Sequence, residues 1–557
     1  MRPVGGAVEW GASAVALAVV AVLVLLPMGM ILYGSLLDSP PGEPGAKFTS
    51  ANYADAFAKA TNRRAFVNTL AVGAISTALA VLLGVPLGWI LARANTPFHA
   101  QFEAMMVAPL LIPPVVGALA WILLASPEIG VLNLGLRRLG IPITLNVYSP
   151  WGIGWVIGTY LSPYVSLFVG GALRSMDPSL EEAAFVAGAG ILRTTRRITL
   201  PLVRPAVLSG MLLVFVIAVG IFAVPTMLGW ASKYYVLTSR IWMTLSFSPV
   251  NYGLATALSS YLIGITMLGV FLHKKFLRQR PYVTVTGRGF RPGRLDLRGW
   301  RFLAFGFCCL YFLLTLAGPF LITLSASFVP FTWKLTLSLD NYRAIYRYEL
   351  FWRALRNTIV VSAAGATVAL TLATVLSWLI HRTRLPGRGV LDYVVMLPVS
   401  LPGIAIAVGV LWTWIQIPIG VYGTLWIIGI GFVGRFVSYG VRSTSANLMQ
   451  IHPELEGSAR VCGASWARTL IRVTLPLIKP GVIAGWVLLF ILFFSELSMV
   501  MVLGSYDSVM LSMLMFEQWQ LGQFTNLAAL SMITITVVFG LVMLFKRVMG
   551  TDFRIQV

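Results

Sequence analysis

Twelve blocks of about twenty apolar residues divide the 557-residue chain. A helix needs about 20 residues to cross a hydrocarbon core of roughly 30 Å, where every backbone N–H and C=O must be paired inside the protein. Only 11% of the residues are charged, against about 25% in soluble domains, so a water-soluble globule is excluded. The blocks predict an all-α polytopic membrane protein with spans near 11–33, 66–92, 104–126, 150–173, 205–229, 251–272, 302–325, 355–380, 391–415, 421–440, 480–502 and 524–545.

The basic residues gather on one side of the predicted spans. Twelve spans place both termini and every even-to-odd connection on the same side, and that side holds 27 of the 41 Lys and Arg residues against 13 on the other. Loops rich in Lys and Arg stay in the cytoplasm, so we expect both termini there. The net charge of +22 is then largely a matter of topology, and no nucleic-acid partner is implied.

The chain contains an internal duplication. A shift of 289 residues aligns six Asn, Trp and Pro positions, among them Trp89 with Trp378 and Pro113 with Pro402. Because each half would hold six spans, the two halves have the same orientation and form a parallel repeat. We expect a first half at 1–272, a basic cytoplasmic linker at 273–301 and a second half at 302–557.

One cytoplasmic loop of each half carries a shared pattern, now at an offset of 275 because the second half lacks a counterpart of the longer external loop at 127–149. Residues 177–189 read DPSLEEAAFVAGA and lead to Leu200-Pro201, while residues 452–464 read HPELEGSARVCGA and lead to Leu475-Pro476. Mainly small residues recur at i, i+3, i+4 and i+7. The spacing predicts a short helix with a face of small residues, which Gly188 or Gly463 ends in a turn.

The order Glu-Ala-Ala, three residues, Gly, nine residues, Ile-x-Leu-Pro resembles the signature loop of bacterial ATP-binding-cassette importer permeases. The first half matches it throughout, whereas the second has Gly457-Ser458-Ala459 in place of Glu-Ala-Ala, with Glu456 as the substitute carboxylate. The resemblance implies the type I permease fold and a coupling helix that docks on an ATPase. The residues that it assigns to coupling are Glu181, Glu182, Ala183, Ala184 and Gly188 in the first half, and Glu456, Ser458, Ala459 and Gly463 in the second.

The fusion of two halves in one chain resembles the ferric-iron permeases and their thiamine and aminophosphonate relatives. The strings 433–439 and 495–498 are similar to the ferric-iron type. The implied function is the permease of an ATP-driven importer of ferric iron, with thiamine, 2-aminoethylphosphonate or a polyamine as alternative cargo. The resemblance also implies a lipid-embedded, multi-pass protein of the bacterial cytoplasmic (inner) membrane that is fed by an external or periplasmic substrate-binding protein.

The chain is expected to be a non-catalytic subunit. A phosphate-binding loop needs Gly-Lys-Ser or Gly-Lys-Thr, and none of the eight lysines follows a glycine. The ATPase dimer must therefore be a separate polypeptide. The four histidines show no metal-ligand spacing, so we expect no resident metal or cofactor.

Two charged residues within predicted spans, Glu496 and Arg435, are candidates for a role inside the membrane. Glu496 is the one acid placed deep in the membrane, where a charge costs about 2.5–3.5 kcal/mol on insertion scales. It is expected to line a translocation path and attract a cation, or to make a satisfied interhelical hydrogen bond. Arg435 is placed near the cytoplasmic end of its span, where it either snorkels to the headgroups or lines the path.

Two other classes of protein fit the sequence less well than the importer. An ion-coupled secondary transporter can also have twelve spans in two parallel halves, but such carriers usually need several ionisable groups in the membrane, and this chain supplies one acid and one base. A membrane-bound enzyme would need His, Cys or carboxylate side chains clustered at one depth, and none is visible in the sequence.

Overall fold

The computed structural model describes residues 6–278, 295–330, 336–383 and 387–549. Over these residues the chain is helical, with ten helices long and apolar enough to cross a membrane, or up to twelve if each of two bent helix pairs counts as one span. The all-α, multi-span expectation is confirmed. Residues 279–294 of the predicted linker lie outside the described residues, and the division into 1–272, 273–301 and 302–557 stays a prediction.

The first half contains α1 Gly6–Val20, α2 Leu26–Ser35, α3 Ala51–Ala58, α4 Ala60–Arg93, α5 His99–Met105, α6 Pro114–Ala125, α7 Val131–Arg138, α8 Pro150–Ser175, α9 Ser179–Val186, α10 Ile191–Thr194, α11 Leu200–Gly220, α12 Ala223–Ser232, α13 Leu237–Ser246 and α14 Tyr252–Arg278. The second contains α15 Trp300–Phe312, α16 Gly318–Ser327, α17 Asp340–Arg347, α18 Glu349–Arg382, α19 Arg388–Met396, α20 Gly403–Gln416, α21 Leu425–Leu448, α22 Pro453–Val461, α23 Trp466–Thr469, α24 Leu475–Phe494, α25 Val500–Leu503, α26 Leu511–Gln520 and α27 Phe524–Met549.

Four of the predicted spans are interrupted. The helices around 104–126 bend by 100° and those around 391–415 by 114°, at the equivalent residues Pro113 and Pro402, whose backbones are extended. Proline supplies no backbone donor, so a helix breaks there. The blocks 205–229 and 480–502 are wrong as continuous helices, because α11 ends at Gly220 and α24 at Phe494, and short helices follow.

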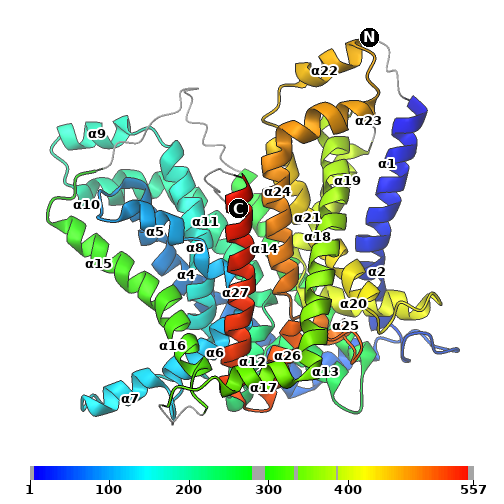
Figure 1. Ribbon diagram of the computed structural model, residues 1–557, viewed down its shortest axis with the longest axis horizontal. Helices are drawn as coiled ribbons and strands as arrows, with labels where there is room; N and C mark the ends of the chain where they lie inside the picture. The colour runs from blue at the N-terminus through cyan, green and yellow to red at the C-terminus, as the bar shows by residue number, and fades with distance from the viewer. Residues whose placement is uncertain (1–5, 279–294, 331–335, 384–386, 550–557) are drawn as a thin grey trace.

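The first span of each half packs against helices of the other half. In the first half, α2 packs against α20, and in the second α16 packs against α6, so the blue N-terminal helix stands among yellow helices (Figure 1). Glycine permits the close contact of α2 with α20, because a Cβ on Gly409 of α20 would collide with the Pro27 carbonyl oxygen of α2. The exchange joins the two repeats into one bundle.

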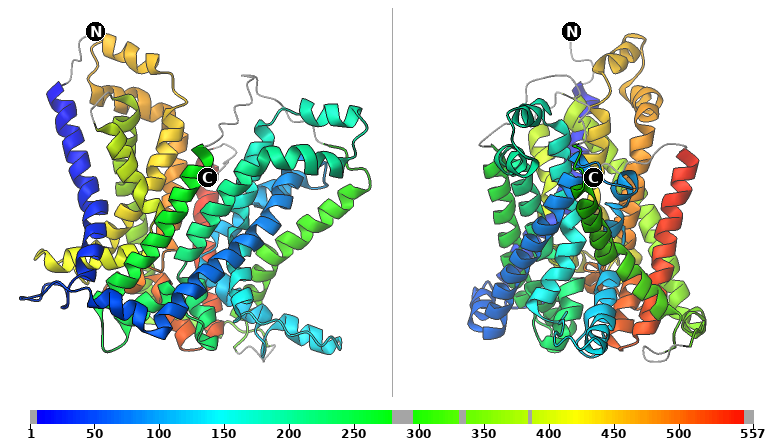
Figure 2. Two further views of the ribbon diagram at one scale, coloured as in Figure 1. Left: turned by 180° about the vertical axis from the view of Figure 1, so that it is seen from behind. Right: turned by 90° about the vertical axis from the view of Figure 1, so that its left-hand side faces the viewer.

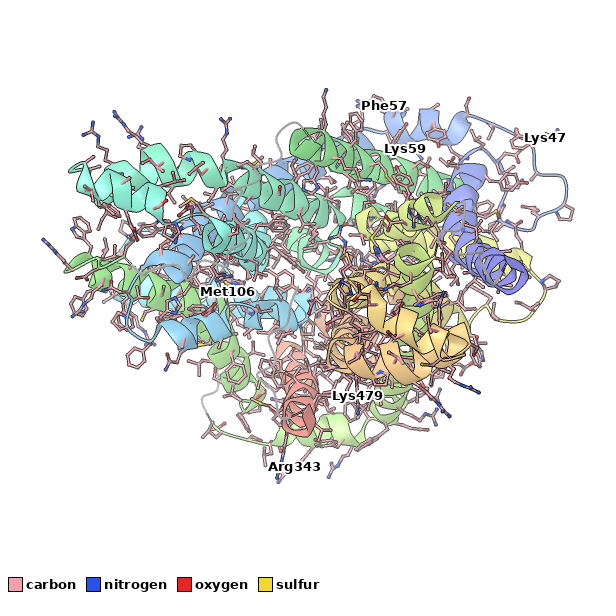
Figure 3. All side chains as sticks on the ribbon, turned by 90° about the horizontal axis from the view of Figure 1, so that it is seen from above. Lys47, Phe57, Lys59, Met106, Arg343 and Lys479 are labelled. Carbon is pink, nitrogen blue, oxygen red and sulfur yellow. The ribbon has the colours of Figure 1, made fainter. Side chains whose placement is uncertain are left out.

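The two signature-loop helices stand at the same end of this bundle. Figure 1 shows α9 and α22 on opposite sides of that end, and Figure 2 shows the same arrangement from behind. Seen from that end, the cyan and the orange arms flank the central helices (Figure 3). Among the candidate spans, α8 and α21 have the largest buried share, 67% and 61%, so they form the centre of the molecule.

Candidate functional site

Both loop helices end at the predicted glycines. Gly188 follows α9 with φ +79°, and Gly463 follows α22 with φ +84°. The next amide closes each turn: Ala189 N donates to Ala184 O at 2.9 Å, and Ala464 N donates to Ala459 O at 3.0 Å. These left-handed turns favour glycine, so the sequence pattern and the local structure agree.

Each loop helix exposes aliphatic side chains at equivalent positions. Val186 is 91% exposed and its counterpart Val461 is 84% exposed, while Leu180 and Leu455 are 43% and 50% exposed. Ala183 and Ser458 are exposed between them, and Ala184 and Ala459 are half-buried. Exposed apolar side chains that recur in both halves are typical of a contact surface for another protein.

The two glutamates of the first loop have different surroundings. Glu182 is exposed, whereas Glu181 is 2% exposed and its Oε2 lies 3.2 Å from Nε of Arg93, the last residue of α4. Thr199, just before α11, donates its hydroxyl to Glu181 Oε1 at 2.5 Å. A buried charge needs an ion-pair partner and hydrogen bonds, and Glu181 has both.

The second half repeats this arrangement. Glu456 is 6% exposed, its Oε1 lies 3.6 Å from Arg382 Nε, and the Thr474 hydroxyl donates to it at 2.8 Å. Arg382 is the counterpart of Arg93 at the 289-residue offset, and Glu456 is the counterpart of Glu181 at the 275-residue offset. We call each set a buried Arg–Glu–Thr anchor.

The anchor of the second half bears on the prediction that Glu456 is the substitute carboxylate of the second loop. The Glu456 carboxylate turns into the protein, and the exposed position that corresponds to Glu182 is held by Gly457. Only the first loop helix therefore presents a carboxylate at this position of its exposed face.

The guanidinium groups of the two anchors have different hydrogen-bond partners. Arg382 donates through Nη2 to the carbonyls of Leu448 and Ile451 at 2.8 and 2.7 Å, whereas Nη1 and Nη2 of Arg93 have no hydrogen-bond acceptor among the described residues. On the first side, the backbone carbonyl of Arg93 and the side chain of Asn95 instead bind the chain that enters the second half.

Residues that lead into α15 are bonded to the end of α4. Leu295 N donates to Arg93 O at 2.7 Å, and Asn95 Nδ2 donates to Asp296 Oδ1 at 2.8 Å. Hydrogen bonds from Arg298 N–H and from the Asn95 amide lower the pKa of Asp296. The first loop helix, α4 and the start of the second half are thus connected through neighbouring residues.

A second group of functional candidates lies at the centre of the bundle. Arg435 Nη1 is 2.8 Å from Glu496 Oε1, and their side chains are 19% and 9% exposed. Glu496 follows the end of α24 and also accepts the Met499 N–H at 3.1 Å. The expected position of Arg435 near a helix end is wrong, because α21 continues to Leu448, and this leaves Arg435 near its middle.

Three tyrosines complete this group. Tyr160 and Tyr164 of α8 are counterparts of Arg435 and Tyr439 of α21 at the 275-residue offset. Tyr439 lies within electrostatic range of Arg435, Glu496 and both first-half tyrosines. We call Tyr160, Tyr164, Arg435, Tyr439 and Glu496 the central polar cluster; all but Glu496 are partly exposed.

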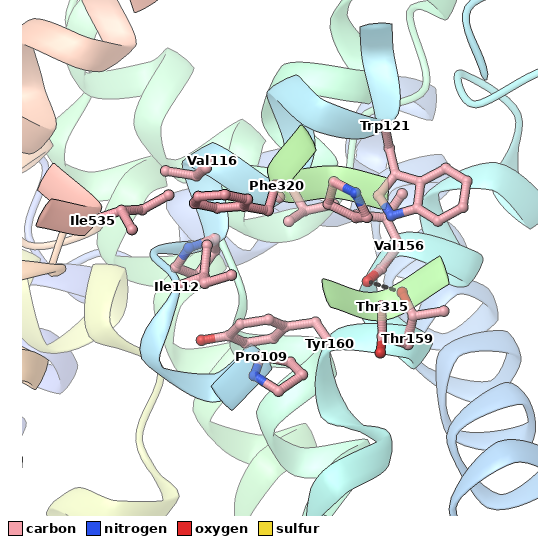
Figure 4. A pocket seen from close by; sticks show the side chains of 14 residues that line it. Pro109, Ile112, Val116, Trp121, Val156, Thr159, Tyr160, Thr315, Phe320 and Ile535 are labelled. Atoms are coloured by element: carbon pink, nitrogen blue, oxygen red, sulfur yellow. Dashed lines mark hydrogen bonds between the residues drawn. The ribbon is translucent and has the colours of Figure 1, made fainter. Parts of the chain in front are cut away.

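A largely apolar pocket is lined by Tyr160 of this cluster and by residues of both halves (Figure 4). It has about 510 Å³ of empty space, part of it open to solvent, and is lined by residues of α6, α8, α16 and α27, including Tyr160 and Phe320. No charged side chain is among its lining residues. The charged part of the candidate site is therefore the Arg435–Glu496 pair and not this pocket.

No sequence motif singles out Arg93, Arg382 or the three tyrosines. The 289-residue offset nevertheless aligns the two arginines with each other, which is a signal for the anchors. A sequence signal for the Arg435–Glu496 pair is Gly403. A Cβ at that position would collide with the Arg435 guanidinium, so glycine leaves room for it. No group of three or more His, Cys, Asp or Glu residues that could hold a metal occurs within the described part of the chain.

Comparison with known proteins identifies a family in both halves. The family described as binding-protein-dependent transport system inner membrane component matches residues 84–279 and 369–547. FbpB 1 of Haemophilus influenzae, named for ferric transport, is 26% identical over 72% of this chain and 64% of its own length. The ferric transport system permease protein FbpB of Actinobacillus pleuropneumoniae is 25% identical over 81% and 66%. The chain thus spans about two thirds of the length of these relatives.

Among solved structures, a bacterial ABC transporter that imports the acidic polysaccharide alginate has a TM-score of 0.40 and 20% identity. The match covers 50% of this chain and 96% of that chain.

The anchors generate a prediction about stability. Glu181→Ala should destabilise the protein by about 3–5 kcal/mol, because it leaves Arg93 buried without its ion-pair partner. Glu182→Ala, one residue away on the exposed face, should stay within about 0.5 kcal/mol of the parent. Thermal unfolding of the purified full chain measures both. Equal unfolding temperatures for the two variants would contradict a supporting role for Glu181.

Proposed function

This chain belongs to the family of binding-protein-dependent transport system inner membrane components, and on that premise we propose that it is the permease of an ATP-driven importer of ferric iron. The importer proposal rests on one observation above all. Two equivalent helices, α9 and α22, stand at the same end of the bundle, each held by a buried Arg–Glu–Thr anchor and each exposing aliphatic side chains.

We propose that α9 and α22 each dock on one subunit of a separate ATPase dimer on the cytoplasmic side. Val186 and Val461 are the apolar contacts, and Glu182 adds a carboxylate contact at a position that Gly457 holds on the second side. The anchors carry the force: a shift of α9 pulls on Arg93 and hence on the 34-residue helix α4. A shift of α22 acts on α18 in the same way through Arg382.

An external substrate-binding protein would deliver the cargo at the opposite end of the bundle. The family description itself specifies dependence on a binding protein. With the ATPase at the α9 and α22 end, this orientation also places both termini in the cytoplasm, in agreement with the distribution of Lys and Arg residues.

The proposed path runs past the central polar cluster. Carboxylate and phenol oxygens are hard ligands of the kind that suit highly charged cations. In the cluster the Glu496 carboxylate lies within electrostatic range of Tyr439, which in turn is within range of Tyr160 and Tyr164. At rest Arg435 neutralises Glu496. We propose that passing ferric iron competes with Arg435 for this carboxylate, and the ferric names of the relatives support this cargo.

Uptake by reconstituted vesicles tests the importer and its cargo together. Vesicles that contain the chain, its ATPase and its binding protein should accumulate radiolabelled ferric iron only when ATP is present on the ATPase side. The chain alone should hydrolyse no ATP. ATP-driven uptake of thiamine, 2-aminoethylphosphonate or a polyamine without iron uptake would contradict ferric iron as the cargo but agree with an importer. ATP hydrolysis by the purified chain alone would contradict the proposal that the ATPase is a separate polypeptide.

The ion pair gives a sharper test of the path. Glu496→Gln should lower iron uptake and leave basal ATP hydrolysis nearly unchanged, because the amide carries no charge to attract the cation. Loss of the partner of Arg435 also destabilises the protein, so the double variant Arg435→Gln, Glu496→Gln serves as the control for folding. If the pair were only structural, the double variant would regain uptake; the cation role predicts that it assembles normally and stays inactive.

The turn after α9 gives a prediction about coupling. Gly188→Ala should loosen the ATPase and lower uptake, because a Cβ in the left-handed region costs roughly 1–2 kcal/mol although the position has open space around it. Gly190→Ala is the matched control, since Gly190 has φ −71° and equally open surroundings. The measurements are co-purification of the ATPase and iron uptake. Identical behaviour of the two variants would count against a role for the turn.

A further inference from the structure

We propose that residues 127–147, which form a hairpin around α7, anchor the protein in the headgroup layer of an anionic lipid leaflet at the end opposite α9 and α22. We call this segment the interfacial hairpin. It corresponds to the longer loop that distinguishes the first half from the second, and it takes no part in the anchors or in the central polar cluster.

The interfacial hairpin is a built structure. Asn133 is 1% exposed and its Nδ2 donates to Ser126 O and to Leu145 O, both at 2.8 Å, while Leu145 N donates to Asn133 Oδ1 at 2.7 Å. Arg137 Nη2 donates to Pro127 O at 2.7 Å. One buried amide thus ties α7 and the returning segment at Leu145 to the end of α6, so the side chains on the surface of the hairpin are held in place.

The surface of the hairpin is aliphatic. Leu139 is 76% exposed and Ile143 is 58% exposed. The full set of exposed aliphatic side chains comprises Ile129, Val131, Leu132, Leu134, Leu139, Ile141, Ile143 and Leu145. Apolar area left in water costs about 25 cal/mol per Å² relative to burial. A fixed aliphatic surface of this kind therefore favours an apolar environment.

Tryptophans mark the level of the membrane boundary next to the hairpin. Trp151 in the first turn of α8 is 69% exposed, and its counterpart Trp426 in the first turns of α21 is 73% exposed. Tryptophan is enriched where the hydrocarbon meets the headgroups. The hairpin ends four residues before Trp151 and is bonded back to α6 by Val147 N to Ala125 O at 3.2 Å, so it leaves the bundle at this boundary.

The position and charge of the hairpin indicate what covers it. Figure 1 and the rear view in Figure 2 show α7 projecting sideways from the bundle, away from the central helices α8 and α21. A partner that covers the mouth of the path would not need this side surface, whereas the surrounding leaflet meets it. Its charged residues are Glu128, Arg137 and Arg138, and the excess of arginine favours anionic headgroups.

Nitroxide labels on the full chain test this proposal. In a background with Cys308, Cys309 and Cys462 replaced by alanine, single cysteines are placed at Leu139 and Ile143. Glu43, exposed in a loop, is the water control, and Leu82, 66% exposed on α4, is the lipid control. The chain is reconstituted in vesicles of phosphatidylethanolamine and phosphatidylglycerol, and collisions of each label with oxygen and with a nickel chelate are measured.

The proposal expects the labels at 139 and 143 to collide more with oxygen than with the nickel chelate, as at 82 and unlike at 43. Arg138→Glu should raise nickel access at 139 in these anionic vesicles and leave it unchanged in phosphatidylcholine vesicles. Labels at 139 and 143 that behave like the label at 43 would overturn the proposal. So would labels that become shielded only after the external binding protein is added, because the surface would then be a protein interface.

Discussion

The structure depends on the requirement that backbone groups within a bilayer find partners inside the protein. Pro113 and Pro402 break two helices at equivalent positions of the two repeats, and a broken helix can stand in a membrane only where other helices surround it. The exchanged first spans meet this need, since α16 packs against α6 and α2 against α20. One physical constraint thus explains why the two repeats interlock.

The two halves are alike at the end of the bundle that carries α9 and α22 and differ at its centre. The ends that carry α9 and α22 keep the same anchors, turns and exposed aliphatic residues in both halves. The centre has diverged, because Tyr160 of the first half is matched by Arg435 in the second, and Ile221 is matched by Glu496. Two like ATPase subunits explain symmetric ends under the proposed function. A single path has no need of symmetry and can carry one charge pair.

Much of the fold was open to prediction from the sequence. The apolar blocks gave the spans, the offsets of 289 and 275 gave the repeat, and the signature loops predicted the helices that end at Gly188 and Gly463. Breaks inside the blocks were harder to predict, since an apolar helix and an apolar break have the same composition. The helix end at Phe494 and the position of Glu496 after it follow from packing that no local pattern records.

What the sequence alone determined is local or periodic: length and hydropathy of each span, the duplication, and a glycine where the backbone turns left-handed. The tertiary structure decided which charges are hidden. Glu181 and Glu182 are adjacent and chemically alike, yet one is buried against Arg93 and the other is exposed. Arg435 and Glu496 are 61 residues apart in the numbering, and they meet because α21 and the end of α24 pack side by side. Ion pairs join residues through space, so only the packed helices could reveal them.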